Sequence, residues 1–192
     1  MDQYDYRQYD RIWERVAPTL NPYPAARTQN SAAAAPMTVQ EEETLPGAQQ
    51  DPCCMGSAAA ESIEVLKGFI EEELADRRYY LAFARQAPNP SAARTLREIA
   101  ADEAGHAKRL LAVYYLITGE CFRPAFGSER ISIGPWCAAL RGRYHEEACG
   151  GFNYIRAAEG TTDPCLNKLL TQLSEDEYRH ADRMLALLER AL

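Results

Sequence analysis

The sequence Glu103-Ala104-Gly105-His106 returns later in the chain as Glu177-Tyr178-Arg179-His180. Each copy has the pattern Glu-x-x-His, which places a carboxylate and an imidazole on the same face of a helix. The residues around each motif recur at the same offset, so the chain contains two copies of one helical unit, an internal repeat, rather than a longer array. The recurring residues are Glu73, Tyr80, Asp102, Glu103 and His106, matched by Glu147, Tyr154, Asp176, Glu177 and His180.

Each motif lies in the middle of an apolar helical stripe. The stripe residues recur three and four positions apart, which is the spacing of an amphipathic helix. Asn89-Pro90 precedes the first stripe, and Asp163-Pro164 precedes the second at the offset of the internal repeat. Such a pair is typical of an N-cap followed by the first helical residue. The stripe residues are Leu96, Ile99, Leu110, Val113 and Ile117 in the first copy and Leu170, Leu173, Met184 and Leu187 in the second.

Four helices follow from this pattern, and the loops between them predict the topology. Two connections are short, as between antiparallel neighbours, whereas residues 119–134 form a long connection that crosses the bundle. The predicted fold is therefore all-α, a ferritin-like antiparallel four-helix bundle built from two helical hairpins with one long crossover. The helices are expected over about residues 58–87 with Ser57 as N-cap, over 90–118, over 135–159 and from 164 onward.

The N-terminal part of the chain has a different composition. Residues 1–56 are rich in Tyr, Pro, Gln and Ala and contain little that a core could bury. We expect an irregular N-terminal arm over 1–56 and the bundle over 57–192.

Both motifs put charged groups where apolar residues are expected. With one glutamate from each preceding helix they make four carboxylates and two imidazoles, the ligand set of a carboxylate-bridged di-metal site in a four-helix bundle. Buried unpaired carboxylates repel each other and lose hydration, and two divalent cations remove that penalty. This donor set suits two iron ions, with manganese as the alternative, and leaves positions open for O2 or H2O2. A single Glu-x-x-His also fits a surface pair or a core histidine, but two in register are specific.

The choice of glutamate on the first and third helices rests on a tyrosine two helical turns further along. Tyr80 follows Glu73 at this spacing, and Tyr154 follows Glu147. The glutamates just before this pair lack a tyrosine that repeats in the same way. The sequence therefore favours Glu73 and Glu147 as ligands and leaves their neighbours as alternatives. These alternatives are Glu72 and Glu146.

Two further repeated residue types stand close to the expected ligands. A metal-bound histidine usually donates its second ring N–H to a carboxylate or carbonyl. We therefore predict that Asp102 and Asp176 each orient the histidine of the opposite hairpin, the alternative being an exposed acidic residue. Tyr80 and Tyr154 are predicted hydrogen-bond donors or radical traps beside the metals, with buried aromatic packing as the alternative.

Composition narrows the class of protein. The net charge of -7 and the lack of a basic stripe argue against nucleic-acid binding. No apolar run is long enough to span a bilayer, and the acidic, aromatic N-terminus is unlike a secretory signal. The six cysteines show no Cys-x-x-Cys spacing, so reduced thiols, including the adjacent Cys53 and Cys54, and a cytoplasmic location are expected. We also expect a homodimer or a higher homo-oligomer.

Two stretches, Glu73–Ala84 and Glu103–Leu110, resemble the rubrerythrin group of the ferritin-like superfamily. In the first, Glu, Arg, Tyr and Phe-Ala stand in register with the rubrerythrin first helix. The resemblance covers about residues 58–192 and leaves the N-terminal arm unexplained. It implies a di-iron centre in which Glu103 and Glu177 bridge the two metals. The ligands that it implies are Glu73, Glu103, His106, Glu147, Glu177 and His180.

The chain departs from the rubrerythrin pattern in two ways. Rubrerythrins carry an additional glutamate one turn after the third-helix ligand, and here that position is Gly150, followed by Gly151. These glycines either open a channel to the metals or permit close helix packing. The chain also has no Cys-x-x-Cys pair for a rubredoxin iron, so the resemblance implies a separate electron donor.

The sequence thus predicts a non-haem di-iron oxidoreductase that reacts with O2 or H2O2. One alternative is an iron-handling protein, a ferroxidase that stores or delivers iron. The other is a structural bundle that uses its metals for stability alone.

Overall fold

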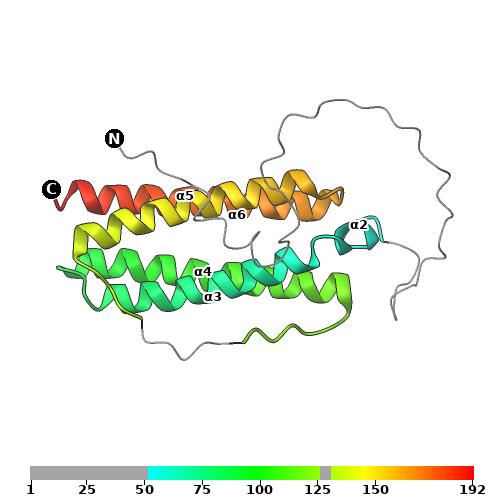
Figure 1. Ribbon diagram of the computed structural model, residues 1–192, viewed down its shortest axis with the longest axis horizontal. Helices are drawn as coiled ribbons and strands as arrows, with labels where there is room; N and C mark the ends of the chain where they lie inside the picture. The colour runs from blue at the N-terminus through cyan, green and yellow to red at the C-terminus, as the bar shows by residue number, and fades with distance from the viewer. Residues whose placement is uncertain (1–51, 126–130) are drawn as a thin grey trace, which may run out of the picture.

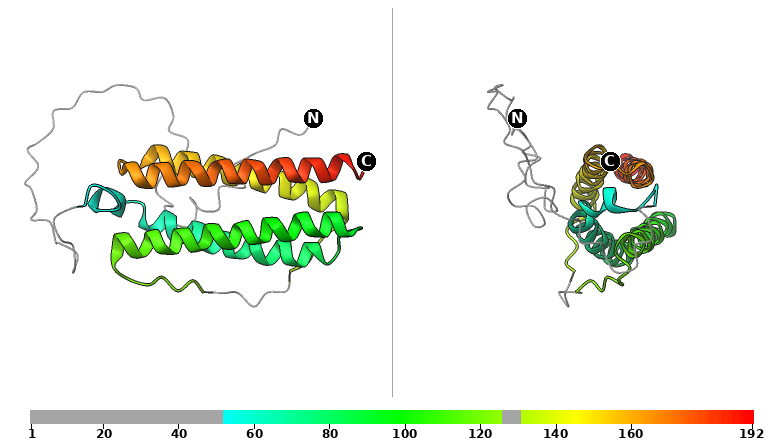
Figure 2. Two further views of the ribbon diagram at one scale, coloured as in Figure 1. Left: turned by 180° about the vertical axis from the view of Figure 1, so that it is seen from behind. Right: turned by 90° about the vertical axis from the view of Figure 1, so that its right-hand side faces the viewer.

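The computed structural model describes residues 52–125 and 131–192, and this part of the chain contains helices and loops only. Figure 1 shows two helical hairpins lying along each other, α3 with α4 and α5 with α6. In the end view of Figure 2 the four long helices surround one interior, and the short α2 lies across one end. The helices are α2 (Ser57–Ala60), α3 (Ile63–Ala84), α4 (Pro90–Thr118), α5 (Trp136–Gly160) and α6 (Pro164–Glu189).

The predicted all-α bundle of two hairpins is confirmed. Helix α4 ends at one end of the bundle and α5 begins at the other, so the connection between them is the predicted long crossover (Figure 1). The second to fourth helices begin within one residue of the predicted positions. Of the expected N-terminal arm, residues 1–51 lie outside the described residues.

The first helix differs from the prediction. The chain forms α2, turns at residues 61–62 and then begins α3 at Ile63, which ends at Ala84 rather than near residue 87. Ser57 was expected to cap this helix, and that prediction is wrong because α2 begins at Ser57 itself, after Gly56. Ala59 of α2 is fully buried in the apolar core, which explains why the chain bends over the end of the bundle.

The caps of the remaining helices follow the sequence closely. The side chain of Asn89 accepts a hydrogen bond from the backbone N–H of Ala92 and caps α4. Asp163 accepts from the N–H groups of Cys165 and Leu166 and caps α6. Gly119 ends α4 in the left-handed conformation, with φ of 70°, which glycine adopts without steric cost.

The core consists of two apolar layers separated by a polar band. One layer, toward the α2 end, is built around Leu66, Phe69 and Leu170, and the other around Phe83, Leu96 and Met184. Between them lies a band of buried charged residues at the middle of the four long helices. The band consists of Glu73, Glu103, His106, Glu147, Glu177 and His180.

No described helix has an apolar stretch long enough to cross a membrane.

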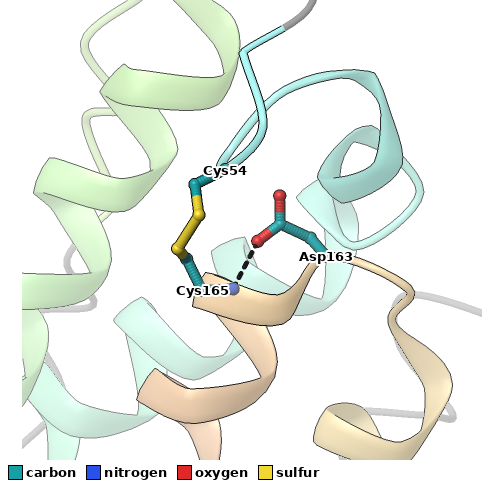
Figure 3. A group of neighbouring side chains, drawn as sticks. All are labelled: Cys54, Asp163 and Cys165. Carbon is teal, nitrogen blue, oxygen red and sulfur yellow. Dashed lines mark hydrogen bonds between the residues drawn. A yellow bond between two sulfur atoms is a disulfide. The ribbon is translucent and has the colours of Figure 1, made fainter.

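A disulfide joins Cys54 to Cys165, and it corrects the expectation that the cysteines are reduced thiols. The bond ties the segment before α2 to the first turn of α6, which Asp163 caps (Figure 3). Asp163 also accepts a hydrogen bond from the N–H of Met55. The two cysteines are 111 residues apart, so only the folded chain brings them together. The reduced-thiol argument for a cytoplasmic location is therefore lost. Among the described residues, the free cysteines are Cys53, Cys121, Cys137 and Cys149.

Removing this disulfide is expected to destabilise the fold. The bond closes a long loop and restricts the unfolded chain, so replacing both cysteines by serine should lower the free energy of unfolding by about 2–4 kcal/mol. Urea denaturation of the double variant measures this loss, and Cys53→Ser is the matched control on the exposed neighbouring thiol. Equal stability of the double variant and the wild type would contradict the prediction.

Candidate metal centre

The polar band brings the six predicted ligands together. They form two overlapping groups, within each of which one ligand atom per residue lies within 4.8 Å of the others. Glu103 of α4 and Glu177 of α6 belong to both groups. The remaining members are Glu73 and His106 in the first group and Glu147 and His180 in the second.

The six side chains are buried, and several of their oxygen and nitrogen atoms have no well-aligned hydrogen bond among the described residues. Each is at most 5% exposed, and Glu103 is only 1% exposed. Among the described residues, neither oxygen of Glu103 accepts a well-aligned hydrogen bond, although Nδ1 of His106 and of His180 lie 3.2 and 3.1 Å away. Buried carboxylates without partners are costly, so the band requires protons or cations. The donor set of four carboxylates and two imidazoles fits two divalent metal ions.

The metal-free centre holds protons in place of cations. Burial raises the pKa of Glu73 to about 7, against the opposing effect of its contact with His106. Burial and the charges of Glu103 and Glu73 raise the pKa of Glu177 well above its ordinary value. Burial lowers the pKa of His106, but hydrogen bonds with the surrounding carboxylates outweigh this and raise it to about 12. The same balance raises the pKa of His180 to about 10.

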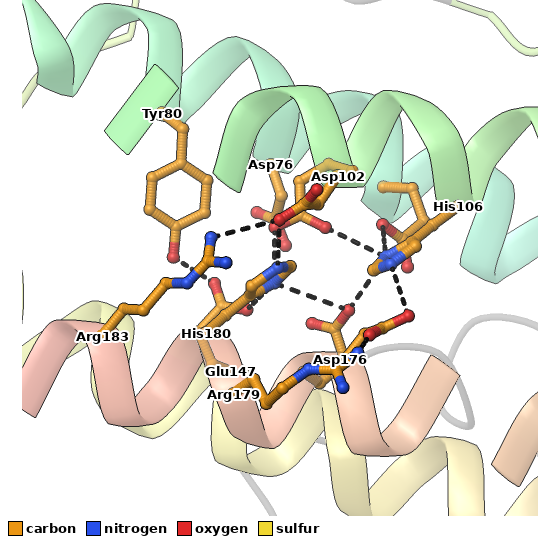
Figure 4. A network of polar contacts seen from close by, with 12 residues as sticks. Asp76, Tyr80, Asp102, His106, Glu147, Asp176, Arg179, His180 and Arg183 are labelled. Carbon is orange, nitrogen blue, oxygen red and sulfur yellow. Dashed lines mark hydrogen bonds and ion pairs between the residues drawn. The ribbon is translucent and has the colours of Figure 1, made fainter. Parts of the chain in front are cut away.

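The two histidines direct opposite edges of their rings to different partners. Nδ1 of each ring faces the carboxylates of the band, and Nε2 faces an aspartate outside it (Figure 4). Nε2 of His180 lies 3.3 Å from Oδ2 of Asp102, and Nε2 of His106 lies 3.3 Å from Oδ2 of Asp176. Each aspartate therefore lies against the histidine of the opposite hairpin, which is the geometry that the orienting hypothesis requires.

The two repeated tyrosines also bond across the hairpins. The hydroxyl of Tyr80 on α3 donates to Glu147 on α5, and the hydroxyl of Tyr154 on α5 donates to Glu73 on α3. Tyr154 in addition stacks on Phe69, with ring centroids 4.2 Å apart. Of the two alternatives drawn from the sequence, hydrogen bonding and aromatic packing, the structure shows both.

The neighbouring glutamates lie outside the two ligand groups. Glu72 and Glu146 are half-buried and line a cavity between α3 and α5, whereas Glu73 and Glu147 point into the band. His145, the remaining histidine of the chain, is half-buried on α5 and also lies outside both groups.

Arg143 is part of the site and was missed by the sequence reasoning. Its guanidinium is 3% exposed and donates to Glu147, to the Tyr80 hydroxyl at 3.1 Å and to Asp76 at 2.8 Å. Burial alone would raise the pKa of Glu147, but this guanidinium holds it below its ordinary value. A signal for it was present, because Arg143 lies one helical turn before Glu147 and its counterpart in the first copy of the internal repeat is Phe69.

The two adjacent glycines serve different purposes. A Cβ atom at Gly151 would lie 2.9 Å from the ring of Tyr178, so this glycine permits close packing of α5 on α6. A Cβ atom at Gly150 would lie 3.3 Å from Oε2 of Glu177, and Gly150 lines the cavity between α3 and α5. Close packing therefore explains Gly151, whereas a channel at Gly150 stays a prediction.

A family model for rubrerythrin matches residues 64–188, which include all six residues of the band. The chain belongs to the rubrerythrin family. No curated protein and no solved structure gave a significant match. Rubrerythrins are ferritin-like di-iron proteins, so the family and the two buried ligand groups both point to a metal centre at this band.

Proposed function

We propose that this rubrerythrin-family chain is a non-haem di-iron oxidoreductase that reacts with O2 or H2O2. The observation that carries the proposal is the pair of buried ligand groups that share Glu103 and Glu177. Two bound ferrous ions would supply two electrons, which with two protons reduce H2O2 to two molecules of water or O2 to H2O2, and a separate donor would return these electrons. Manganese is the alternative metal.

The protein residues hold this centre in place. Glu103 and Glu177, which belong to both ligand groups, would hold both metals, and Nδ1 of each histidine faces the same carboxylates and would be the imidazole ligand of one group. Asp102 and Asp176 would keep one proton of each imidazole on Nε2, so that Nδ1 is the nitrogen that loses its proton and binds a metal. The hydroxyl of Tyr80 donates to one oxygen of Glu147, and that of Tyr154 donates to one oxygen of Glu73. The other oxygen of each carboxylate would be the one that binds a metal.

Mixing the ferrous protein with each oxidant tests the reaction. The protein is loaded anaerobically with two Fe(II) per chain and mixed with O2 or with H2O2 in a stopped-flow spectrometer. We expect the ferric absorption to appear with at least one oxidant. Bound iron that stays ferrous with both oxidants would rule out the oxidoreductase and leave a metal-stabilised bundle.

One observation favours iron handling as a second function. Five of the residues that line the cavity at Glu73 and Glu177 carry carboxylates, which attract cations, and one carries a guanidinium. An iron-handling protein oxidises many equivalents of Fe(II) per chain, whereas a two-iron oxidoreductase stops at two without a donor. Adding excess Fe(II) in air and following its oxidation separates the two functions.

Metal binding is expected to release protons. Because the pKa values of His106 and His180 are raised to about 12 and 10, both imidazoles are protonated in the metal-free protein at neutral pH and must each lose a proton to bind a metal. Below pH 7 Glu73 adds to this release, so metal affinity should rise with pH. Calorimetric titration in buffers of different ionisation enthalpy should show about two or more protons per chain. No proton release would contradict the prediction.

Removing an orienting aspartate should weaken metal binding without unfolding the protein. Asp102 contacts Nε2 of His180 from outside the ligand groups, so Asp102→Ala is expected to lower metal affinity by about 10- to 100-fold. Asp182→Ala, on the exposed face of α6, is the matched control. Unchanged metal occupancy in Asp102→Ala at limiting metal would show that the aspartate has no such role.

A further inference from the structure

The cavity between α3 and α5 reaches only some of the residues of the ligand band. It has a volume of about 100 Å³ and is lined by Glu73, which belongs to the first ligand group only, and by Glu177, which belongs to both, but not by Glu147. Glu177 is 5% exposed, and among the described residues its Oε1 accepts no well-aligned hydrogen bond. The cavity thus ends on a buried carboxylate whose Oε2 lies beside Gly150, while Oε1 lies 3.1 Å from Nδ1 of His106 inside the band.

A break in the internal repeat explains why the cavity opens on this side. Asp76 on α3 corresponds to Gly150 on α5. At Asp76, which also lines this cavity, the carboxylate is bound by Arg143, which pairs as well with Glu146 at 2.6 Å and with Glu147. At Gly150 there is no side chain, and a Cβ atom there would lie only 3.3 Å from Oε2 of Glu177, so the glycine leaves this oxygen uncovered.

The charges on the cavity wall favour a cation. The cavity is lined by five carboxylates and by one guanidinium, that of Arg143. A cleft lined by one sign of charge raises the local concentration of the opposite ion and its rate of association. The carboxylates are Glu72, Glu73, Asp76, Glu146 and Glu177.

A larger groove on the other side of the bundle is less suited to this task. It lies between α4 and α6, has a volume of about 550 Å³ and carries three arginines against three acidic residues. Its floor is the Nε2 edge of His106 and His180, where Asp102 and Asp176 already lie. A cation in this groove would be separated by the imidazole rings from the carboxylates that Nδ1 faces.

We propose that the cavity over Gly150 is the route by which divalent cations reach the centre, and that it serves the group of Glu73, Glu103, His106 and Glu177. The proposal rests on the di-metal function proposed above. Glu72 lines the cavity and attracts the ion, which then binds to Glu73 and Glu177. Because Arg143 binds Glu147 and neither Glu147 nor His180 lines the cavity, the group of these two residues is the less accessible of the two.

Loading of the full-length metal-free protein with Co²⁺ tests the route, with visible absorption as the readout. An equilibrium titration first shows whether two ions bind per chain, and stopped-flow mixing then gives the loading rate. Ala75 is an exposed cavity residue on α3, so Ala75→Phe should obstruct the cavity and slow loading several-fold at unchanged stoichiometry. Ala101→Phe places the same side chain in the α4–α6 groove and should load at the wild-type rate.

A second pair of variants tests the role of charge. Glu72→Gln should slow loading by about three- to tenfold at low ionic strength and much less at high salt. Glu175→Gln, in the opposite groove, should have no such effect. Wild-type rates in both cavity variants, slower loading in Ala101→Phe, or a lost equivalent of metal in Glu72→Gln would overturn the route. If the wild type binds no Co²⁺ at equilibrium, the metal centre itself is refuted, and this outcome is distinct from a failure of the route.

Discussion

Replacing Glu177 by glutamine should abolish the stabilisation of the protein by metal while leaving the metal-free protein intact. Glu177 belongs to both ligand groups, so its loss as an anionic bridge affects both metal positions. A ligand that binds only the folded state at about 1,000 times its dissociation constant stabilises it by about 4 kcal/mol. The wild type should gain about this amount on metal addition. The variant should gain little.

The metal-free variant gives the more discriminating result. The pKa of Glu177 is raised in the folded state by burial and by neighbouring carboxylates, so the carboxyl keeps its proton after the unfolded chain has lost its own. The wild type therefore loses stability as the pH rises from about 4.5 toward the raised value, and glutamine, which does not titrate, avoids this loss. We expect equal stability of variant and wild type at low pH and a more stable variant at higher pH.

Thermal unfolding across this pH range, with and without Mn²⁺ or Co²⁺, measures both effects. Glu175→Gln is the matched control, because it makes the same change two residues away on the exposed face of α6. A Glu177→Gln protein that is stabilised by metal as strongly as the wild type would show that Glu177 is not a shared ligand.

The parts of the structure that follow local rules were predictable from the sequence. Spacing three residues apart on a helix placed Glu103 with His106, and the internal repeat placed the second copy opposite the first. The N-caps Asn89 and Asp163 were predictable for the same reason, since a cap depends on residues within one helical turn. The helix pairs and the positions of the six band residues follow from these local signals.

The features that were missed depend on contacts between distant segments. The pairing of Cys54 with Cys165 requires the segment before α2 to fold over the start of α6, and no local spacing predicts that. Ser57 does not cap because α2 bends to bury Ala59 at the end of the bundle. Arg143 was overlooked because a lone arginine beside glutamates is usually solvated, and only its departure from the repeat marks it.

Arg143→Met is expected to destabilise the metal-free protein by about 3–5 kcal/mol, because it leaves buried carboxylates without their counter-ion. The guanidinium is 3% exposed and binds Glu147, Asp76 and the Tyr80 hydroxyl. Burial already raises the pKa of Asp76 to about 6 against the opposing charge of Arg143, so loss of that charge should raise it further. Arg97→Met, on the exposed face of α4, is the control and should change the free energy of unfolding by less than about 0.5 kcal/mol.

The same variant separates the two sources of positive charge at the centre. In the wild type Arg143 neutralises Glu147 permanently, and the metals would supply the remaining positive charge. Without the guanidinium, bound cations have more uncompensated negative charge to offset, so added Mn²⁺ should stabilise Arg143→Met more than it stabilises the wild type. Urea denaturation of both proteins with and without Mn²⁺ gives this coupling free energy as a double difference. A coupling of zero would mean that Arg143 and the metals act on separate carboxylates, and Glu147 would then have to be removed from the ligand set.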